Sequence, residues 1–302
     1  MRVGRIPYIN CYPVYGAIDR GLLPLAGTIV DGIPSTLNRM MADGELDVSV
    51  VSAVEYARAA SRYLLLPDLA ISCDGPVRSV MLFSKRPAPE LTGRRVLLTR
   101  SSMTSVALLR LLFRHVWRAQ PDFAAGDAEL RDVERLASEP HDARLVIGDA
   151  ALLLGAAQSP RSVVHHANGS SEPETPGAER SGAHALPSYP YVYDLGAAWK
   201  AWTGLPFVFA VWVARRDAAV GAALAVHAQL IESRDWGLAH VDTLAAQASD
   251  ATGLPRATCA TFLSGLDYRL SYGHLAGLTD FFRRLAADGE VPDGSLAFLP
   301  AA

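Results

Sequence analysis

The chain has 302 residues, half of them hydrophobic and a fifth charged, and its 28 Lys and Arg against 31 Asp and Glu leave a formal net charge of −3. This is the composition of a soluble globular protein long enough for two domains, and without a basic excess nucleic acid is not expected as a partner. The three cysteines, Cys11, Cys73 and Cys259, are isolated, which predicts reduced thiols in a cytoplasmic protein. The sequence has no signal-peptide pattern and no apolar run of the roughly 20 residues that span a bilayer, so no membrane partner is expected.

Short strands and helices alternate from the N-terminus, a rhythm that predicts a mostly parallel sheet covered on both faces. Strands are expected at Arg2–Ile6, Thr28–Asp31 and Val48–Val51, and helices at Pro13–Arg20, Pro34–Ala42 and Ala53–Ala60. A β-rich stretch follows from Leu69 to Ser84, with Gly75-Pro76 as a turn. The Pro-rich, charged segment at 85–90 predicts a boundary near Pro87.

A second βαβ pattern begins after this boundary. Strands are expected at Arg95–Thr99 and Leu145–Ile147, and an amphipathic helix at Ser105–Trp117. Residues 165–188 are rich in Gly, Ser, Pro, Glu and Ala, which predicts a flexible loop. His165, His166 and His184 lie in or beside it and are too few for a transition-metal site. Beyond it we expect the strand Tyr191–Asp194, the helix Gly196–Trp202 and the apolar strand Phe207–Ala214.

The remaining third of the chain is predicted to be helical, at Ala218–Glu232, Trp236–Ala246, Arg256–Leu263 and Leu275–Asp288. Helices alone cannot form a second sheet, so this tail is expected to pack on the first lobe. The chain would then cross between two lobes near Pro87 and Pro206. We therefore expect residues 1–87 and 206–302 to form lobe 1 and residues 88–205 to form lobe 2.

Four apolar runs end in small hydroxyl, amide or acidic residues and then lead into helices. The junctions are Pro7-Tyr8-Ile9-Asn10, Ser52-Ala53-Val54-Glu55, Thr99-Arg100-Ser101-Ser102-Met103-Thr104-Ser105 and Gly148-Asp149-Ala150. In open α/β sheets, ligands bind beyond the carboxyl ends of the strands, where helix N-termini favour anions. The pattern predicts a pocket for a small carboxylate compound, held without metal or phosphate loop.

Several stretches resemble the menaquinone-biosynthesis family that includes chorismate dehydratase. They are Gly4-Arg5-Ile6-Pro7-Tyr8-Ile9-Asn10-Cys11, Gly75-Pro76-Val77-Arg78-Ser79-Val80-Met81-Leu82-Phe83-Ser84, the turn Ser101–Ser105, Ile147-Gly148-Asp149-Ala150, the segment from Tyr193 to Ala210, and Leu266-Asp267-Tyr268-Arg269-Leu270-Ser271-Tyr272. The resemblance implies an α/β fold of the type II periplasmic-binding-protein-like class, with a ligand cleft between two lobes. It also implies a carbon–oxygen lyase (a hydro-lyase) of the futalosine route that needs no metal or organic cofactor.

The resemblance assigns the reaction to Asn10 and Ser79, which as ordinary residues would be a helix cap and a half-buried strand serine. Contacts to the substrate carboxylates are expected from Ser52, Ser101, Ser102, Thr104 and Gly148, although helix capping alone also explains the hydroxyls. Arg78 is a weaker anion contact, because in a regular strand it faces away from Ser79. Asp149 is expected to orient other groups, because an unpaired carboxylate would repel a dianionic substrate.

No side chain stands out as the general base, since His115, His141 and His274 fit surface or packing roles. One hypothesis is that the enolpyruvyl carboxylate of chorismate itself removes the proton. Two alternatives stay open. The sister 1,4-dihydroxy-6-naphthoate synthase is expected to carry a histidine where this chain has Gly148-Asp149, and a non-catalytic cytoplasmic protein could bind an aromatic acid. The sequence allows a monomer or a homodimer.

Overall fold

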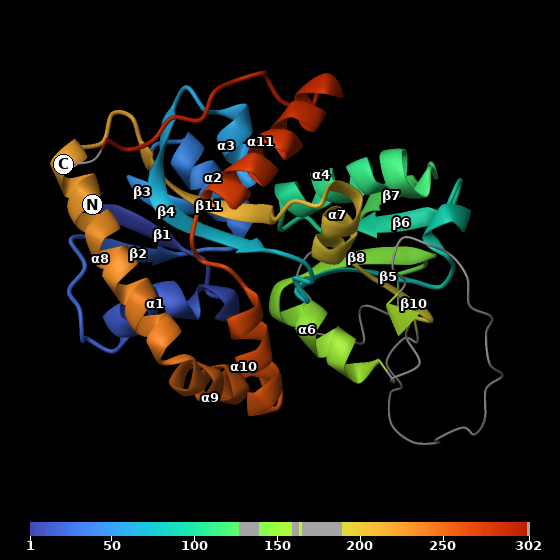
Figure 1. Cartoon of the computed structure of the whole chain (residues 1–302), viewed down its shortest axis with the longest axis horizontal. Helices are drawn as coiled ribbons and strands as arrows, with labels where there is room; N and C mark the ends of the chain where they lie inside the picture. The colour runs from blue at the N-terminus through green and yellow to red at the C-terminus, as the bar shows by residue number, and fades with distance from the viewer. Residues whose placement is uncertain (127–138, 159–162, 165–188, 301–302) are drawn as a thin grey trace.

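The computed structural model describes residues 1–126, 139–158, 163–164 and 189–300 and contains two α/β lobes side by side (Figure 1). One sheet has the strand order β2-β1-β3-β11-β4 and the other β7-β6-β8-β5-β10-β9. The predicted α/β architecture of two lobes is therefore confirmed. The loop expected at residues 165–188, with His165, His166 and His184, lies outside the described residues.

The first lobe is built from segments at both ends of the chain. Its strands are β1 (Arg2–Arg5), β2 (Thr28–Asp31), β3 (Val48–Ser52), β4 (Tyr63–Cys73) and β11 (Phe207–Arg215). The 3₁₀ turn η1 (Ile9–Cys11) and the helices α1 (Tyr12–Asp19), α2 (Pro34–Ala42) and α3 (Ala53–Arg58) follow β1, β2 and β3. Strand β1 pairs in parallel with β2 and β3, whereas β11 runs antiparallel to β3 and β4.

The second lobe likewise consists of one sheet whose strands are connected by helices. Its strands are β5 (Val80–Ser84), β6 (Arg95–Leu98), β7 (Asp122–Ala125), β8 (Ala143–Ile147), β9 (Val163–Val164) and β10 (Tyr191–Asp194). Its helices are the short η2 (Ala88–Glu90), α4 (Met103–Leu112) with its π-helical continuation η3 (Phe113–Trp117), α6 (Gly148–Ala157) and α7 (Leu195–Thr203). Strand β5 is antiparallel to β8 and β10, its two neighbours. The strands β7 and β9 were not predicted.

The predicted β-rich stretch from Leu69 to Ser84 is corrected by the sheet order. Strand β4 starts earlier, at Tyr63, and belongs to the first sheet, whereas β5 belongs to the second. Two segments thus connect the sheets: the first crossing, residues 74–79, and the second crossing, residues 195–206. The expected lobe division at residues 87 and 206 stays a prediction, and the sheet order favours a first boundary before Val80.

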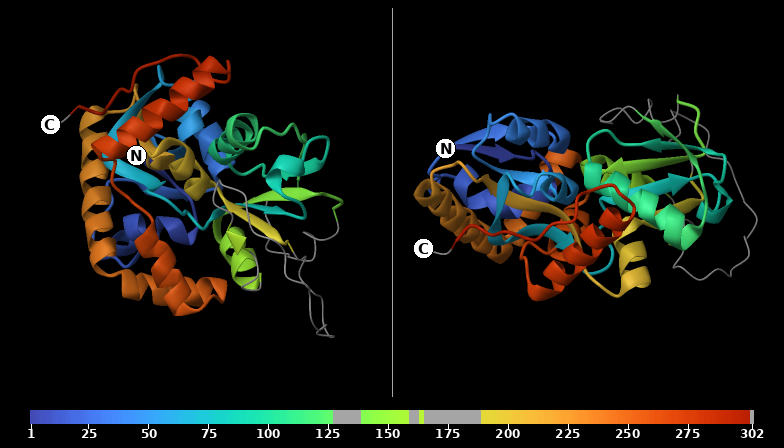
Figure 2. Two further views of the ribbon diagram at one scale, coloured as in Figure 1. Left: turned by 45° about the vertical axis from the view of Figure 1, so that its right-hand side comes forward. Right: turned by 90° about the horizontal axis from the view of Figure 1, so that it is seen from above.

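The C-terminal helices pack on the first lobe, as predicted (Figures 1 and 2). They are α8 (Val220–Ala239), α9 (Val241–Thr252), α10 (Arg256–Gly265) and α11 (Tyr272–Ala287). Helix α8 lies directly on α1, where a Cβ on Gly237 would come within 2.2 Å of the carbonyl oxygen of Pro13. The break expected before Trp236 falls instead at His240. Among the described helices none combines the length and hydropathy needed to cross a membrane.

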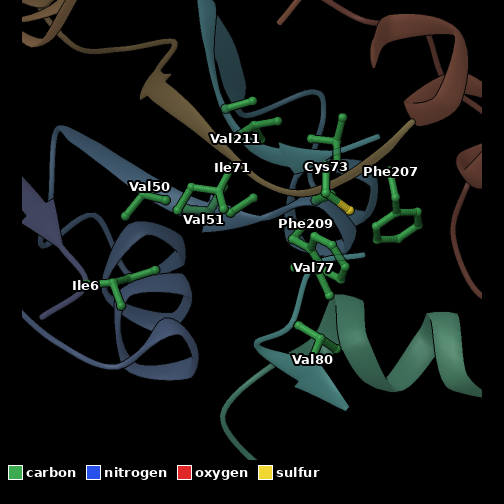
Figure 3. Close-up of a cluster of buried hydrophobic side chains, with 14 of the residues drawn as sticks. Ile6, Val50, Val51, Ile71, Cys73, Val77, Val80, Phe207, Phe209 and Val211 are labelled. Carbon is green, nitrogen blue, oxygen red and sulfur yellow. The ribbon is translucent and has the colours of Figure 1, made fainter. Parts of the chain in front are cut away.

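Apolar side chains fill the junction between the lobes. Val77 of the first crossing gathers in one cluster with Cys73 of β4, Val80 of β5, and Phe207 and Phe209 of β11 (Figure 3). All five residues of β3 are buried, as expected of a strand covered on both faces. The core therefore runs continuously from one lobe into the other.

Candidate active site

A pocket lies where the two sheets meet, and all four junctions singled out in the sequence contribute to it. Its lining comprises Ile6, Tyr8, Asn10, Pro34, Ser52, Ile71, Val77, Ser79, Val80, Ser102, Ser105, Ile147, Gly148, Phe209 and Ala210. Figure 3 labels five of the apolar lining residues, Ile6, Ile71, Val77, Val80 and Phe209. The free volume is about 60 Å³, below the roughly 300–1,000 Å³ of typical ligand pockets. In this structure the pocket is therefore too small to hold a typical ligand.

Asn10 enters the pocket from the 3₁₀ turn that follows β1. Its side-chain oxygen Oδ1 is buried and has no hydrogen-bond partner among the described residues. The turn itself is held from the other lobe, because the N–H of Ile9 donates to Oδ1 of Asp149 at 3.3 Å. A buried acceptor left unpaired is costly unless a ligand supplies the donor. The side chain of Asn10 is therefore suited to accept a hydrogen bond from a bound molecule.

Ser79 lines the pocket from a tight turn, which corrects the expectation of a regular strand at this position. Its N–H donates to the carbonyl of Val77 at 2.7 Å, and Arg78 between them has a left-handed φ of 61°. The hydroxyl of Ser79 is buried and makes one long bond, 3.4 Å, to the same carbonyl. Because that bond is weak, the hydroxyl is able to turn toward a ligand.

Ser52 ends β3 and is held by a buried asparagine of α2. The amide Nδ2 of Asn38 donates to the Ser52 hydroxyl at 2.8 Å, and the N–H of Ser52 donates to Oδ1 of Asn38 at 3.2 Å. The hydroxyl makes no capping bond to α3, whose first residue follows directly. Ser52 thus presents a hydroxyl of fixed orientation to the pocket, while α3 is capped from elsewhere.

Ser102 and Ser105 form a hydroxyl pair at the start of α4. The N–H of Ser105 donates to Oγ of Ser102 at 3.2 Å, and that hydroxyl donates to Oγ of Ser105 at 2.9 Å. The hydroxyl hydrogen of Ser105 is then available to an acceptor in the pocket. The predicted set of site residues did not include Ser105, although its three-residue spacing from a helix-capping serine was a usable signal.

Four predicted contact residues do not line the pocket. Arg78 extends toward α10, since a Cβ on Gly265 would meet its guanidinium at 2.5 Å. Ser101 is buried beneath the turn, with its N–H donating to Oγ1 of Thr99 at 3.1 Å. Thr104 accepts the N–H of Val54 at 3.1 Å and so caps α3 across the lobes. Asp149 is the fourth, bound to the backbone of Ile9, an orienting contact of the kind expected for it.

Gly148 begins α6 directly after β8 with a φ of 64°, a region that favours glycine. Its N–H donates to the carbonyl of Ser79 at 2.8 Å. The ring of Tyr8 packs so closely that a Cβ on Gly148 would lie 3.2 Å from it. Tyr8, like Phe209, was not predicted as a site residue. Gly148 therefore joins the turn of Ser79 to the segment that carries Asn10.

The pocket is mostly apolar, and the polar groups that line it are uncharged. Of the described residues that line it, none is Lys, Arg, His, Asp or Glu. His115 stacks on Trp202, His141 bonds to Tyr189, and His274 forms the capping box of α11 with Ser271. The described part of the chain also contains no group of three or more His, Cys, Asp or Glu residues that could hold a metal ion. Amides, hydroxyls and backbone N–H groups are what this site offers a ligand.

A larger depression lies away from this pocket, between η3 and α11. Its volume is about 610 Å³. Arg114 and His115 approach the carboxylate of Asp288 there, at 2.6 and 3.7 Å. It is remote from the carboxyl ends of the strands, where α/β folds bind their ligands. We therefore place the candidate site at the lobe junction.

Comparison with known proteins gives the family. A family model described as menaquinone biosynthesis matches residues 1–168 and 177–287. The chain is 34% identical to a chorismate dehydratase of Thermus thermophilus over 285 residues, 92% of this chain and 95% of that protein.

Solved structures agree in fold. A protein of Archaeoglobus fulgidus superposes with a TM-score of 0.72 at 20% identity, covering 96% of this chain and 98% of that one. The alkanesulfonate-binding protein SsuA of Xanthomonas axonopodis pv. citri gives 0.60 at 14% identity, covering 98% and 96%. These neighbours show the periplasmic-binding-protein-like fold, and the two sequence matches show that the chain belongs to the menaquinone-biosynthesis family.

Proposed function

We propose that this protein is a chorismate dehydratase, a hydro-lyase that converts chorismate to 3-[(1-carboxyvinyl)oxy]benzoate in the cytoplasm. The family and the dehydratase of Thermus thermophilus support the assignment. The observation that carries it is the buried Oδ1 of Asn10, which has no hydrogen-bond partner among the residues that the structure describes and lies in a pocket to which those residues contribute no charged side chain. At neutral pH both carboxyl groups of chorismate are ionised, so its ring hydroxyl is its one hydrogen-bond donor. The Oδ1 of Asn10, a hydrogen-bond acceptor, is therefore suited to bind the ring hydroxyl, which is the group that leaves in the reaction.

The main contribution that the reaction needs from the protein is the orientation of the substrate. A proton is lost from the ring carbon that bears the ether, the C–H electron pair enters the ring, and the C–O bond to the hydroxyl breaks. The proton and the hydroxide leave together as water, and the product ring is aromatic. Because aromatisation favours the products strongly, positioning and stabilisation of charge on the ring carboxylate account for catalysis.

Asn10 and Ser79 act on the substrate in this proposal. Asn10 accepts a hydrogen bond from the leaving hydroxyl and so fixes the orientation of that hydroxyl. Ser79 donates a hydrogen bond to the substrate. The remaining donors, Ser52, Ser102 and Ser105, together with the N–H groups at the start of α4, are suited to the two carboxylates.

The proton is removed by the enolpyruvyl carboxylate of the substrate, which then passes it to the departing hydroxide, so that one water is released and the carboxylate is ionised again. The support for this step is the chemistry of the lining: in the described part of the chain no carboxylate or imidazole faces the pocket. The carboxylate is three bonds from the ring carbon that carries the proton, so the pocket needs only to hold it there. If instead a side chain were the base, replacing one cleft acid or histidine would abolish turnover.

The test is to incubate the purified protein with chorismate and a chelator and to follow products by mass and ultraviolet absorbance. Loss of one water in the wild type is expected. Asn10→Ala and Ser79→Ala should each lower kcat by roughly 100- to 1,000-fold, as for removal of one transition-state hydrogen bond. Ser84→Ala is the control, since Ser84 ends β5 with its hydroxyl bonded to the carbonyl of Arg86, away from the pocket. Its kcat should match the wild type.

Either alternative would give a different result. Chorismate recovered unchanged would reject dehydration and leave a binding protein for aromatic acids. The sister naphthoate synthase is disfavoured by Gly148, which occupies the place where a histidine is expected and lines the pocket without a side chain.

A further inference from the structure

A buried carboxylate ties the two crossings together behind Ser79. Asp194, the last residue of β10, is 6% exposed. One of its oxygens accepts the N–H groups of Val77 and Ala197, both at 3.0 Å, and the other accepts the N–H of Arg78 at 2.7 Å. Val77 and Arg78 belong to the first crossing, and Ala197 lies in the first turn of α7. One side chain thus spans two segments more than 100 residues apart in the sequence.

The segment that Asp194 holds is strained. The turn from Val77 to Ser79 closes on a 2.7 Å bond with Arg78 in the left-handed region, which non-glycine residues rarely adopt. Turns of three residues with a positive φ at the centre are rare because they are strained, and they persist only where the surroundings impose them. Of the three N–H groups that Asp194 binds, two belong to the first two residues of this turn.

The second crossing is packed tightly against the first. A Cβ on Gly196 would lie 2.6 Å from Sγ of Cys73 and 2.6 Å from the carbonyl oxygen of Gly75. The backbone at the start of α7 therefore lies directly on the first crossing and carries the Asp194 carboxylate to it. On its other side the turn is anchored by the Gly148 N–H bonded to the carbonyl of Ser79.

We propose that Asp194 is a positioning residue: its carboxylate holds the strained turn at residues 77–79 and so places the Ser79 hydroxyl in the pocket. This inference rests on the proposed function for the role of Ser79 in turnover, but the contact itself is independent of it. An ionised carboxylate makes stronger bonds to backbone N–H groups than a neutral acceptor does. Its two oxygens also allow it to reach both segments at once.

Two variants separate this role from the capping of α7. In Asp194→Asn the amide oxygen is able to accept the N–H of Ala197 and cap the helix. The amide NH₂ group then faces the N–H of Arg78, and two donors cannot form a hydrogen bond. In Asp194→Ser the hydroxyl still caps Ala197 and is too short to reach the first crossing. Thr203→Val is the control, because Thr203 bonds Trp199 and Leu205 at the far end of the same helix.

We expect Asp194→Ser to lower kcat by about 100-fold with KM changed only a few-fold, as for a misplacement of about 1 Å at a reacting group. In the Ser79→Ala background the same change should lower kcat no further, because both act through one hydroxyl. Amide hydrogen exchange at Val77 and Arg78 should become at least about tenfold faster. Thr203→Val should leave kcat and these two amides unchanged.

Unchanged exchange at Val77 and Arg78 in both variants would overturn the inference, whatever the activity. So would a kcat that falls equally with and without the Ser79 hydroxyl, because Asp194 would then act through something else. If wild-type protein leaves chorismate intact, the proposed function fails, and the exchange measurement still decides whether Asp194 holds the turn.

Discussion

Replacing Gly148 by alanine tests the geometry of the lobe junction. Gly148 has a φ of 64°, its N–H binds the carbonyl of Ser79, and its missing Cβ leaves room for the ring of Tyr8. Gly148→Ala therefore combines two perturbations, a left-handed alanine and a contact of 3.2 Å with Tyr8. The first acts on stability and the second on the pocket.

The size of each effect follows from the structure. A left-handed conformation costs an L-residue about 1–2 kcal/mol, which corresponds to a fall in Tm of roughly 2–6 °C for a domain of this size. A Cβ at 3.2 Å from the Tyr8 ring moves the ring by a few tenths of an ångström. Since about 1 Å of misplacement at a reaction site costs on the order of 100-fold, kcat should fall on the order of tenfold.

Gly93→Ala is the matched control in the same lobe. Gly93 has a φ of 67°, and a Cβ there would meet nothing within 4 Å. Thermal unfolding should show similar losses of Tm in both variants, whereas steady-state kinetics should show a loss of kcat in Gly148→Ala alone. Equal kcat values in the two variants would refute the reasoning, because the Tyr8 contact would then not reach the reacting groups.

Two further predictions concern the lobe contact and the pH dependence of stability. Thr104→Val removes the acceptor of the Val54 N–H, and an unsatisfied buried N–H costs about 1–3 kcal/mol. Because the pocket of this closed form is too small for a ligand, weakening the bond between the lobes should favour the open form and lower the substrate Kd by up to roughly 5- to 100-fold, measurable by calorimetry in the inactive Ser79→Ala background. Burial lowers the pKa of His141 below its usual value, so the unfolded chain binds the proton more readily. Stability should therefore be lost as pH falls through about 6.5, and Tm measured against pH should decline less steeply in His141→Gln.

Each of these has an outcome that would contradict it. A substrate Kd unchanged in Thr104→Val, with Tm lowered, would mean that the bond to Val54 persists when the lobes open. An equally steep decline of Tm in wild type and His141→Gln would mean that His141 does not carry the acid sensitivity, despite its bonds to Tyr189 and Glu139.

Local patterns determined most of the elements and part of the site. The helix Pro34–Ala42 and the strand Tyr191–Asp194 have the predicted bounds, since a proline at a helix start and a run of β-formers are local signals. The four strand–helix junctions were predicted to meet, and Asn10, Ser52, Ser102 and Gly148 do line one pocket. Parallel strands bring their carboxyl ends to the same edge of a sheet, which explains why the junctions after β1 and β3 meet in one sheet and those after β6 and β8 in the other. The packing of one sheet's edge against the other brings all four together.

Tertiary structure decided what no local pattern specifies. Alternation placed Ser79 in a strand, but Asp194, more than 100 residues away, binds the preceding N–H groups and stabilises a turn instead. Thr104 was predicted to contact the substrate, but its hydroxyl accepts the N–H of Val54 and caps α3 of the other lobe, while the hydroxyl of Ser52 binds Asn38. Sequence determined which polar groups the junctions carry. Only the packing of the lobes decided which of those groups bind the backbone and which remain available to a ligand, because the donors that compete for them come from distant segments.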